Sequence, residues 1–420
     1  MSKTTTVTSS HVTQNRKDPM TDTPIPAILD SLSGYVDGVL PELVDLAMNI
    51  HANPEIRFEE YHAAKVLTEA LETDGFAVER GVGGLETAFV GRWSTSTATP
   101  ESTTIAVFCE YDALEGIGHA CGHNLIAACG LGAGQLVKQW LQENHDVPAN
   151  LMVIGSPGEE GGAGKVPLIE ANVLDGVDIA IMVHPSSYNA VVGASMARIA
   201  LDIKFTGRAS HAAGAPELGR NALDASVLAL NAIGLLRQQT PDGVRIHGIV
   251  TDGGEAPNII PEHTALRVFL RSGDQENLIS DILPRVRACF EGAAIATGCE
   301  VEIQENTPRY ESVMQNRVLA GLAQDAYEAL GRDLVVPAGP RGSTDMGNVS
   351  QRVPAMHPMM RLADGSPHTR EFADDAAGPA AEGLIRDGAL MLAATAVAAF
   401  ADRDIVERAH AAFEAGETAR

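Results

Sequence analysis

The segment His119-Ala-Cys-Gly-His123 places one thiol and two imidazoles within five residues. It follows the strand-like run Thr104–Cys109 and opens a helix rich in glycine and alanine. Thiolate and imidazole are ligands that transition metals prefer, so their spacing here indicates a metal site. Taken alone, the segment fits a reduced buried cysteine with two structural histidines equally well.

Other strand-like runs are followed by side chains that can bind metals or move protons. Such runs lead into Asp112, Glu159-Glu160 and His184, and His368 lies in a loop near the C-terminus. In open α/β sheets, sites lie beyond the carboxyl ends of the strands. One ion rarely takes five protein ligands and still leaves room for substrate, so two ions that share ligands fit better. The metal ligands that we expect are Cys121, His123, Glu160, His184 and His368.

Five motifs, in order along the chain, resemble those of the aminoacylase-type zinc exopeptidases. They are Glu110-Tyr-Asp-Ala-Leu, Gly118-His-Ala-Cys-Gly-His-Asn, Pro157-Gly-Glu-Glu-Gly-Gly, Ser210-His-Ala-Ala and Gly342-Ser-Thr-Asp-Met-Gly-Asn. The resemblance runs from about residue 40 to about residue 400. It favours the branch of p-aminobenzoyl-glutamate hydrolase, the β-alanyl-lysine dipeptidase-like proteins and the auxin-conjugate amidohydrolases. Most relatives carry His-x-Asp where this chain has Glu110-Tyr-Asp, so we expect His123 to supply the missing imidazole ligand.

The residue types and the resemblance together suggest roles for residues outside the ligand set. Glu159 would be the general base that takes a proton from a metal-activated water. Asp112 would orient a ligand imidazole, and His211 would contact the transition state. Ser343 would lie on the wall that receives the acyl group. The candidates for binding the free carboxylate of the substrate are Asn258, Arg271 and Arg341, although each arginine fits a surface ion pair equally well.

These features predict a metal-dependent amidohydrolase or peptidase that acts on small N-acyl or aminoacyl amino acids or dipeptides. The cofactor would be one or two divalent ions; the thiolate favours zinc, with manganese, cobalt or nickel as alternatives. A non-catalytic protein that binds a metal or an amino acid on the same fold would not need Glu159 beside Glu160. A hydrolase with Cys121 as its nucleophile is disfavoured by the ligand-like spacing to His123, and it would resist chelators.

The order of the expected elements divides the chain. After a helix over Leu40–Asn53, strands and helices alternate up to about residue 192, which indicates an α/β fold with a mixed sheet and helices on both faces. Residues 197–306 are expected to follow the order β-α-β-β-α-β, a ferredoxin-like unit that the resemblance makes a lid and dimerisation domain. The catalytic domain would then comprise residues 23–196 and 307–420, and residues 1–22 would be a disordered tail.

The composition limits the partners that we expect. The 420 residues include 30 Lys and Arg and 55 Asp and Glu, a formal net charge of −25 that argues against nucleic acids and anionic membranes. No apolar run is expected to span a membrane. The expected partners are a small amide or dipeptide substrate and a second copy of the chain in a homodimer.

The five cysteines do not indicate a disulfide framework, so a cytoplasmic protein is expected. Apart from Cys121, they are expected to be small buried residues, at positions Cys109, Cys129, Cys289 and Cys299.

Overall fold

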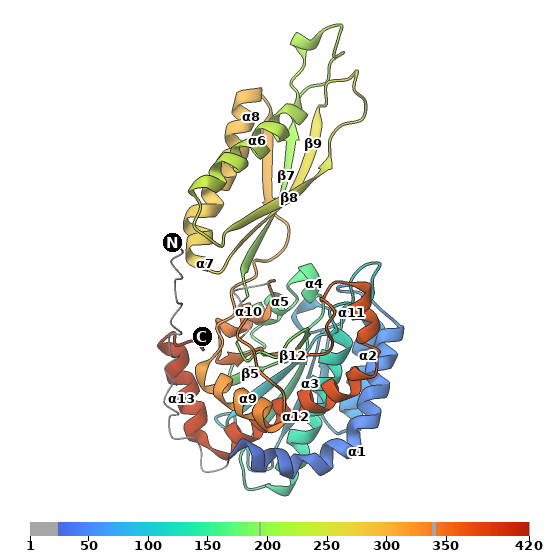
Figure 1. The fold of residues 1–420 in the computed structure, drawn as a ribbon, viewed down its shortest axis with the longest axis vertical. Coiled ribbons are helices and arrows are strands. Elements are labelled where there is room, and N and C mark those ends of the chain that lie inside the picture. The colour runs from blue at the N-terminus through green and yellow to red at the C-terminus, as the bar shows by residue number, and fades with distance from the viewer. Residues whose placement is uncertain (1–23, 193–194, 338–341, 420) are drawn as a thin grey trace, which may run out of the picture.

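The computed structural model describes residues 24–192, 195–337 and 342–419, which form a large body and an elongated insertion (Figure 1). The expected disordered tail at residues 1–22 lies outside the described residues. In the large body, the sheet and its helices bring the N-terminal and C-terminal parts of the chain together. The insertion lies between these parts in the sequence and projects from one end of the large body.

A six-stranded mixed sheet with the strand order β1-β2-β4-β3-β5-β11 forms the centre of the large body. Its strands are β1 (Ala77–Arg80), β2 (Phe89–Ser94), β3 (Thr104–Cys109), β4 (Asn150–Gly155), β5 (Ile179–Ile181) and β11 (Ala355–Met356). The pairs β3–β4, β3–β5 and β5–β11 are parallel, whereas β1 and β2 form an antiparallel edge. Every residue of β3 is buried, as is typical of a central parallel strand. A short parallel pair, β6 (His184–Ser186) and β12 (Met359–Arg361), lies beyond β5 and β11.

Helices pack on both faces of this sheet because neighbouring residues of each strand point to opposite sides. Ile105 and Val107 of β3 belong to the larger core, and Ala106 and Phe108 belong to the smaller one. The larger core contains residues of α1 (Ile25–Ala52), α2 (Tyr61–Thr73), α3 (His123–Glu143), α9 (Arg317–Ala329), α11 (Arg370–Asp375), α12 (Ala380–Ala401) and α13 (Arg403–Glu414). The smaller core contains residues of α5 (Lys165–Glu170) and α10 (Met346–Ser350). The mixed α/β class predicted from the sequence is therefore confirmed.

One helix among the described residues, α12, is long and apolar enough to cross a membrane. This corrects the expectation that no run of the chain would reach that length. In the fold, 83% of its most apolar window is buried, and the helix packs against α1 and α3. Its length and composition are therefore those of a central core helix.

The insertion has the expected element order. It consists of β7 (Ala197–Thr206), α6 (Ala222–Leu236), β8 (Arg245–Asp252), β9 (His263–Ser272), α7 (Gln275–Asn277), α8 (Leu283–Thr297) and β10 (Glu300–Glu305). The strands form an antiparallel sheet in the order β10-β7-β9-β8, and they have a hydrophobic core of their own. This is a ferredoxin-like arrangement. The role of the insertion as a lid or as a dimerisation surface stays a prediction.

Two local expectations need correction. The helix expected to begin at Leu40 begins at Ile25 and continues through Pro41, because apolar residues such as Leu32 and Val36 extend its buried face toward the N-terminus. Cys289 and Cys299, expected to be buried, are half-buried in the insertion. The other two cysteines of that group, at positions 109 and 129, are buried in the large body as expected.

Candidate active site

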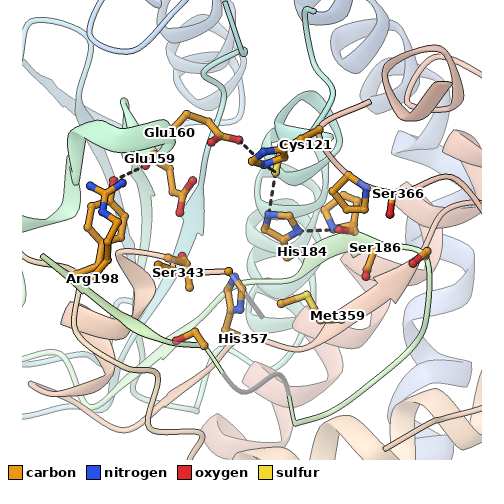
Figure 2. Close-up of a pocket in the computed structure, with 18 of the residues that line it drawn as sticks. Cys121, Glu159, Glu160, His184, Ser186, Arg198, Ser343, His357, Met359 and Ser366 are labelled. Atoms are coloured by element: carbon orange, nitrogen blue, oxygen red, sulfur yellow. Dashed lines mark hydrogen bonds and ion pairs between the residues drawn. The ribbon is translucent and has the colours of Figure 1, made fainter. Parts of the chain in front are cut away.

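A cavity of about 320 Å³ lies beyond the carboxyl ends of the central strands, at the junction with the insertion (Figure 2). This volume lies at the lower end of the range for small-molecule sites. The residues around it come from loops, the short strands β6 and β12 and the short helix α4 of the large body, and from strands β7 and β9 of the insertion. They include Cys121, Glu159, Glu160, His184, Arg198, Arg271, Tyr310, Ser343, His357, Met359 and His368.

Cys121 lies at the centre of the predicted ligands. Its Sγ lies 3.6 Å from Nε2 of His184 and 3.5 Å from Nε2 of His368. His368 Nε2 in turn lies 3.3 Å from Oε1 of Glu160. Ligand atoms within 4.8 Å of one another form one group with Cys121, His123 and His184, and a second group with Cys121, Glu160 and His368. A further group by the same distance joins Glu159 to His123 and Glu160. The structure thus brings all five predicted ligands together, with the cysteine common to the first two groups.

Asp112 connects the two ligand groups. Its Oδ1 lies 2.9 Å from Nδ1 of His123, and its Oδ2 accepts a hydrogen bond of 2.8 Å from the backbone N–H of Glu160. The first contact leaves Nε2 of His123 available to the ligand group. Asp112 is fully buried, so it holds both partners in place in the way expected for a carboxylate that orients a ligand imidazole.

The polar atoms around this cluster fit a bound cation. Oε2 of Glu110 and Nε2 of His123 are buried 3.5 Å apart, and neither has a hydrogen-bond partner among the described residues. Burial, together with the carboxylate of Glu160, raises the pKa of the Cys121 thiol well above its usual range. A reactive cysteine nucleophile needs the opposite shift, whereas a bound metal ion stabilises a thiolate directly. The residues present therefore fit divalent metal ions better than they fit cysteine catalysis.

Glu159 and Glu160 follow a tight turn after β4, in the short helix α4 (Glu159–Gly162). Gly158 has φ of +69°, and a Cβ there would lie 2.6 Å from the Phe58 ring, so glycine is required at this position. Burial raises the pKa of Glu159 well above its usual range, and the neighbouring carboxylates of Glu110 and Glu160 raise it further. Burial opposes ionisation of Glu160 too, but the contacts with His368 and other neighbours outweigh it and hold that pKa at about 2. The pKa values of the two adjacent carboxyls are thus shifted in opposite directions, as expected if Glu159 is the base and Glu160 is a ligand.

A buried ion-pair cluster lies behind the site. Nζ of Lys165 bonds Oε1 of Glu110 and lies 2.7 Å from Oδ1 of Asp345, and all three side chains are fully buried. The backbone N–H of Lys165 also donates a hydrogen bond of 3.0 Å to Oδ2 of Asp345. Burial alone would lower the pKa of Lys165, but the two carboxylates raise it. This lysine joins the end of β3, the loop after Glu160 and the segment that carries Ser343.

Two arginines face each other across strands β7 and β9 on the insertion side of the cavity. Arg198 and Arg271 are directly paired in the antiparallel register. Among the described residues, neither forms an ion pair, and the Nε atoms of both are buried without a hydrogen-bond partner. Burial and the charge of Arg198 lower the pKa of Arg271. Two like charges at opposing positions, largely removed from water, are unfavourable unless an anion accompanies them.

Each arginine is held by neutral neighbours. The Arg271 guanidinium donates to Oγ of Ser343 at 3.2 Å. The Arg198 guanidinium lies 3.9 Å from the centre of the Tyr310 ring and donates to Oγ1 of Thr307 at 3.2 Å. The Tyr310 hydroxyl donates to the backbone carbonyl at position 159 over 2.6 Å, which connects the base of the insertion to the loop that carries both glutamates.

His357 is a further cavity residue that the sequence did not single out. It lies between β11 and β12, and its ring centre is 5.5 Å from that of His184. The side chain is 1% exposed, and both ring nitrogens lack a hydrogen-bond partner among the described residues. Burial lowers the pKa of His357 well below its usual range.

The remaining predicted residues lie in different places. Ser343 and Arg271 both line the cavity, where Arg271 donates a hydrogen bond to Ser343. The position expected for Ser343, on the wall that receives the acyl group, stays a prediction. His211 and Asn258 are neighbours in the insertion, joined through the N–H of residue 212 and the Asn258 carbonyl at 3.0 Å, and neither lines the cavity. Arg341 lies outside the described residues. The roles of His211 and Asn258 therefore stay predictions that require the insertion to move or a second chain to contribute.

Comparisons with known proteins agree with this arrangement. The sequence pattern of peptidase family M20/M25/M40 matches residues 100–384. The chain is 38% identical over 373 residues to the Xaa-Arg dipeptidase of Mus musculus, covering 86% of each chain. It is 33% identical over 306 residues to one of the chains of p-aminobenzoyl-glutamate hydrolase from Escherichia coli, covering 68% of this chain and 62% of that protein.

Among solved structures, a dinuclear metal binding peptidase of the M20 family from Bacillus subtilis superposes with a TM-score of 0.62 at 20% identity. The match covers 85% of this chain and 98% of that structure, and it shows a shared fold. The family pattern spans more than half of the chain and includes the ligand cluster and both glutamates of the loop after β4. The chain therefore belongs to peptidase family M20/M25/M40, and it is a metal-dependent hydrolase of amide and peptide bonds, as its sequence predicts.

Proposed function

We propose that this enzyme hydrolyses dipeptides and N-acyl amino acids that end in a free carboxylate. The observation that carries the proposal is the position of Glu159, a buried carboxyl with a raised pKa, in one cavity with a ligand cluster and an arginine pair. A base, a metal cluster and an anion-binding group in a cavity of about 320 Å³ suit a small substrate. The names of the relatives, an Xaa-Arg dipeptidase and a p-aminobenzoyl-glutamate hydrolase, support this substrate size.

The ligand cluster would hold two divalent ions. Cys121, His123 and His184 would bind the first, and Cys121, Glu160 and His368 would bind the second, with the thiolate shared. Zinc is the ion that a thiolate and imidazoles favour, and manganese, cobalt and nickel are the alternatives. When bound, such ions would polarise the scissile carbonyl and acidify a water molecule.

Glu159 would move the proton. As the base, it accepts a proton from the attacking water and later delivers it to the amine that leaves. The backbone carbonyl of Glu159 accepts a hydrogen bond from the Tyr310 hydroxyl, and Gly158 sets the turn before it. Contacts of the backbone therefore position this residue. Glu160 remains ionised and available as a ligand, because its contacts, with His368 first among them, hold its pKa at about 2.

Arg271 and Arg198 would bind the free carboxylate of the substrate. A carboxylate between the two guanidiniums would relieve their repulsion and replace its lost hydration with charge-assisted hydrogen bonds. Ser343 carries no charge, but its hydroxyl accepts a hydrogen bond from the Arg271 guanidinium and holds it at the cavity wall. The sequence suggested Arg271 for this role, whereas Arg198 follows from its position opposite Arg271 in the strand register.

The test is metal-dependent release of an amino acid from a panel of dipeptides and N-acyl amino acids. We expect protein purified without chelator to contain divalent metal by elemental analysis, to lose activity on chelation and to regain it with zinc, manganese, cobalt or nickel. Cys121→Ala and His184→Ala should lose metal, while the control variants Cys299→Ala and His145→Ala keep it. Full metal content and activity in the first two variants would reject the proposed ligand set.

The insertion would act as a lid and as the contact surface of a homodimer. Helix α6 exposes Val227, Leu228 and Leu235, and the edge strand β8 exposes Ile249 and Val250. A second copy of the chain would cover these apolar side chains, and lid closure would bring the predicted histidine of the insertion to a substrate oxyanion.

Mixing Glu159→Gln chains with His211→Ala chains tests whether the site is shared. Activity should be restored in the mixed dimer if His211 acts on the site of the other chain. A monomer at working concentration would reject the dimer.

A further inference from the structure

His357 is a buried imidazole for which the described part of the fold provides no partner. Its side chain is 1% exposed and lines the cavity beside His184, as Figure 2 shows. Its backbone is fixed, because its N–H donates to Oε1 of Gln315 at 2.8 Å. Both ring nitrogens nevertheless lack a hydrogen-bond partner among the described residues. Since an unsatisfied buried polar group is costly, the position favours a molecule that enters the cavity as the partner of this ring.

The ring is outside the metal cluster. Among the described residues, none of the groups of ligand atoms within 4.8 Å of one another includes His357. Its neighbour His184 already contacts Cys121 at 3.6 Å through Nε2 and bonds the Pro185 carbonyl at 2.7 Å through Nδ1. His357 therefore lies next to a predicted metal ligand but is not itself a member of the ligand groups.

The position of His357 assigns it to the acyl half of the substrate. With the scissile carbonyl at the ligand cluster and the free carboxylate on the arginine pair, the acyl half extends away from the arginines. Ser186, Ser187, Tyr188, His357 and Met359 are cavity residues on or next to the short strands β6 and β12. The acyl half would lie against this wall rather than near Ser343, which holds Arg271. Among the described cavity residues, the only carboxylates are Glu159 and Glu160, and both have roles in catalysis or metal binding. A polar acyl half would therefore meet neutral acceptors on this wall.

We propose that His357 accepts a hydrogen bond from the amino group of an aminoacyl half, so that the enzyme favours dipeptides over substrates with a plain acyl group. This inference rests on the proposed function and adds the chemical class of the acyl half. A neutral imidazole offers one acceptor nitrogen, and an ammonium donor makes that bond charge-assisted. A plain alkanoyl group would leave the ring nitrogens unpaired, which is how a site built for a hydrogen bond rejects an analogue that lacks it.

The experiment compares substrates that differ only in an ammonium and a methyl group. Glycyl amino acids are compared with propanoyl amino acids, and 3-aminopropanoyl with butanoyl amino acids, using the same C-terminal residue. We expect the wild type to prefer one of the aminoacyl members by at least about 10-fold in kcat/KM. In His357→Leu this preference should fall to about 1, while His357→Gln, which keeps an acceptor, should retain part of it. Met360→Leu is the control, because Met360 is buried in strand β12 but does not line the cavity, and it should keep the full preference.

Metal content and melting temperature of each variant complete the test. Unchanged metal in His357→Leu and His357→Gln is expected, and a loss of metal would make the residue a ligand and overturn the proposal. An aminoacyl preference that is equal in wild type and His357→Leu would also overturn it. Equal hydrolysis of both members of each pair by the wild type would reject the inference alone, whereas hydrolysis of neither would reject the proposed function together with it. Should His357→Leu be unstable, the comparison of His357→Gln with Met360→Leu decides.

Discussion

Asp112 holds two predicted metal ligands at once, with Oδ1 on the His123 ring at 2.9 Å and Oδ2 on the Glu160 N–H at 2.8 Å. We expect Asp112→Asn to lower metal affinity about 10–100-fold, because the amide no longer accepts at both positions and the ring loses its fixed orientation. Competition against a chromophoric chelator measures this. Asp178→Asn is the matched control, since Asp178 pairs with His410 at 3.2 Å away from the cavity. Equal affinity in wild type and Asp112→Asn would contradict the orienting role.

Glu159→Gln keeps the shape of the side chain and removes the base. We expect kcat to fall by about 10²–10⁴-fold, the usual contribution of a positioned general base, while the metal content stays unchanged. Elemental analysis and steady-state kinetics on the same preparation separate the two effects. The exposed glutamate of α5, Glu170, provides the control substitution Glu170→Gln. Wild-type turnover by Glu159→Gln would remove this residue from the mechanism.

The arginine pair should make the enzyme sensitive to the charge at the substrate terminus. Converting the terminal carboxylate to an amide should cost about 1.5–3 kcal/mol in kcat/KM, the range for a hydrogen bond to a charged group. In Arg271→Met and Arg198→Met this difference between acid and amide should shrink, mainly through a higher KM for the acid. Identical kcat/KM for acid and amide with the wild type, across several acyl groups, would show that the carboxylate is not recognised.

Lys165→Met should destabilise the fold strongly. It would leave the carboxylates of Glu110 and Asp345 buried without their cation, and breaking a buried pair on one side costs about 3–5 kcal/mol. Chemical denaturation of the metal-free protein gives the free energy of unfolding without the contribution of bound ions. Lys65→Met serves as the control, because the Lys65–Glu69 pair is exposed and such pairs contribute little. Similar stability of both variants would show that the buried cluster contributes nothing to the fold.

The sequence predicted the strands that a simple physical signal marks. Thr104–Cys109 is observed as β3, and the strand-like run that leads into Glu159-Glu160 is observed as β4, because central parallel strands are continuously apolar. The insertion followed the expected order since its strands alternate and its helices show a 3.6-residue period. Helix α1 was expected to start at Leu40 but starts at Ile25, so Pro41 lies inside the helix and not in its first turn. Proline is favoured in the first turn of a helix and disfavoured in its interior. Pro41 inside this helix shows that packing outweighs the local preference.

The metal-ligand cluster of the candidate site was predictable from the types of its residues and from their positions at the ends of strands. Cys121 and His368 lie together as expected, although 247 positions separate them in the sequence. Arg198 and His357 could not be found in this way. The role of Arg198 depends on the strand register of the insertion, and that of His357 depends on a cavity wall formed by two short strands. His211 illustrates the reverse case, because a motif identifies it while the observed arrangement leaves it outside the cavity.

The pairing of β5 with β11 has a consequence for synthesis of the chain. Ala180 pairs with Ala355, and the entire insertion is made between them. The insertion has its own core and local strand pairs, so we expect it to fold on the ribosome first, while the sheet beside it still lacks an edge strand. His368 follows later still and completes the second ligand group. A nascent chain should therefore remain without hydrolytic activity until almost the whole protein has left the ribosome.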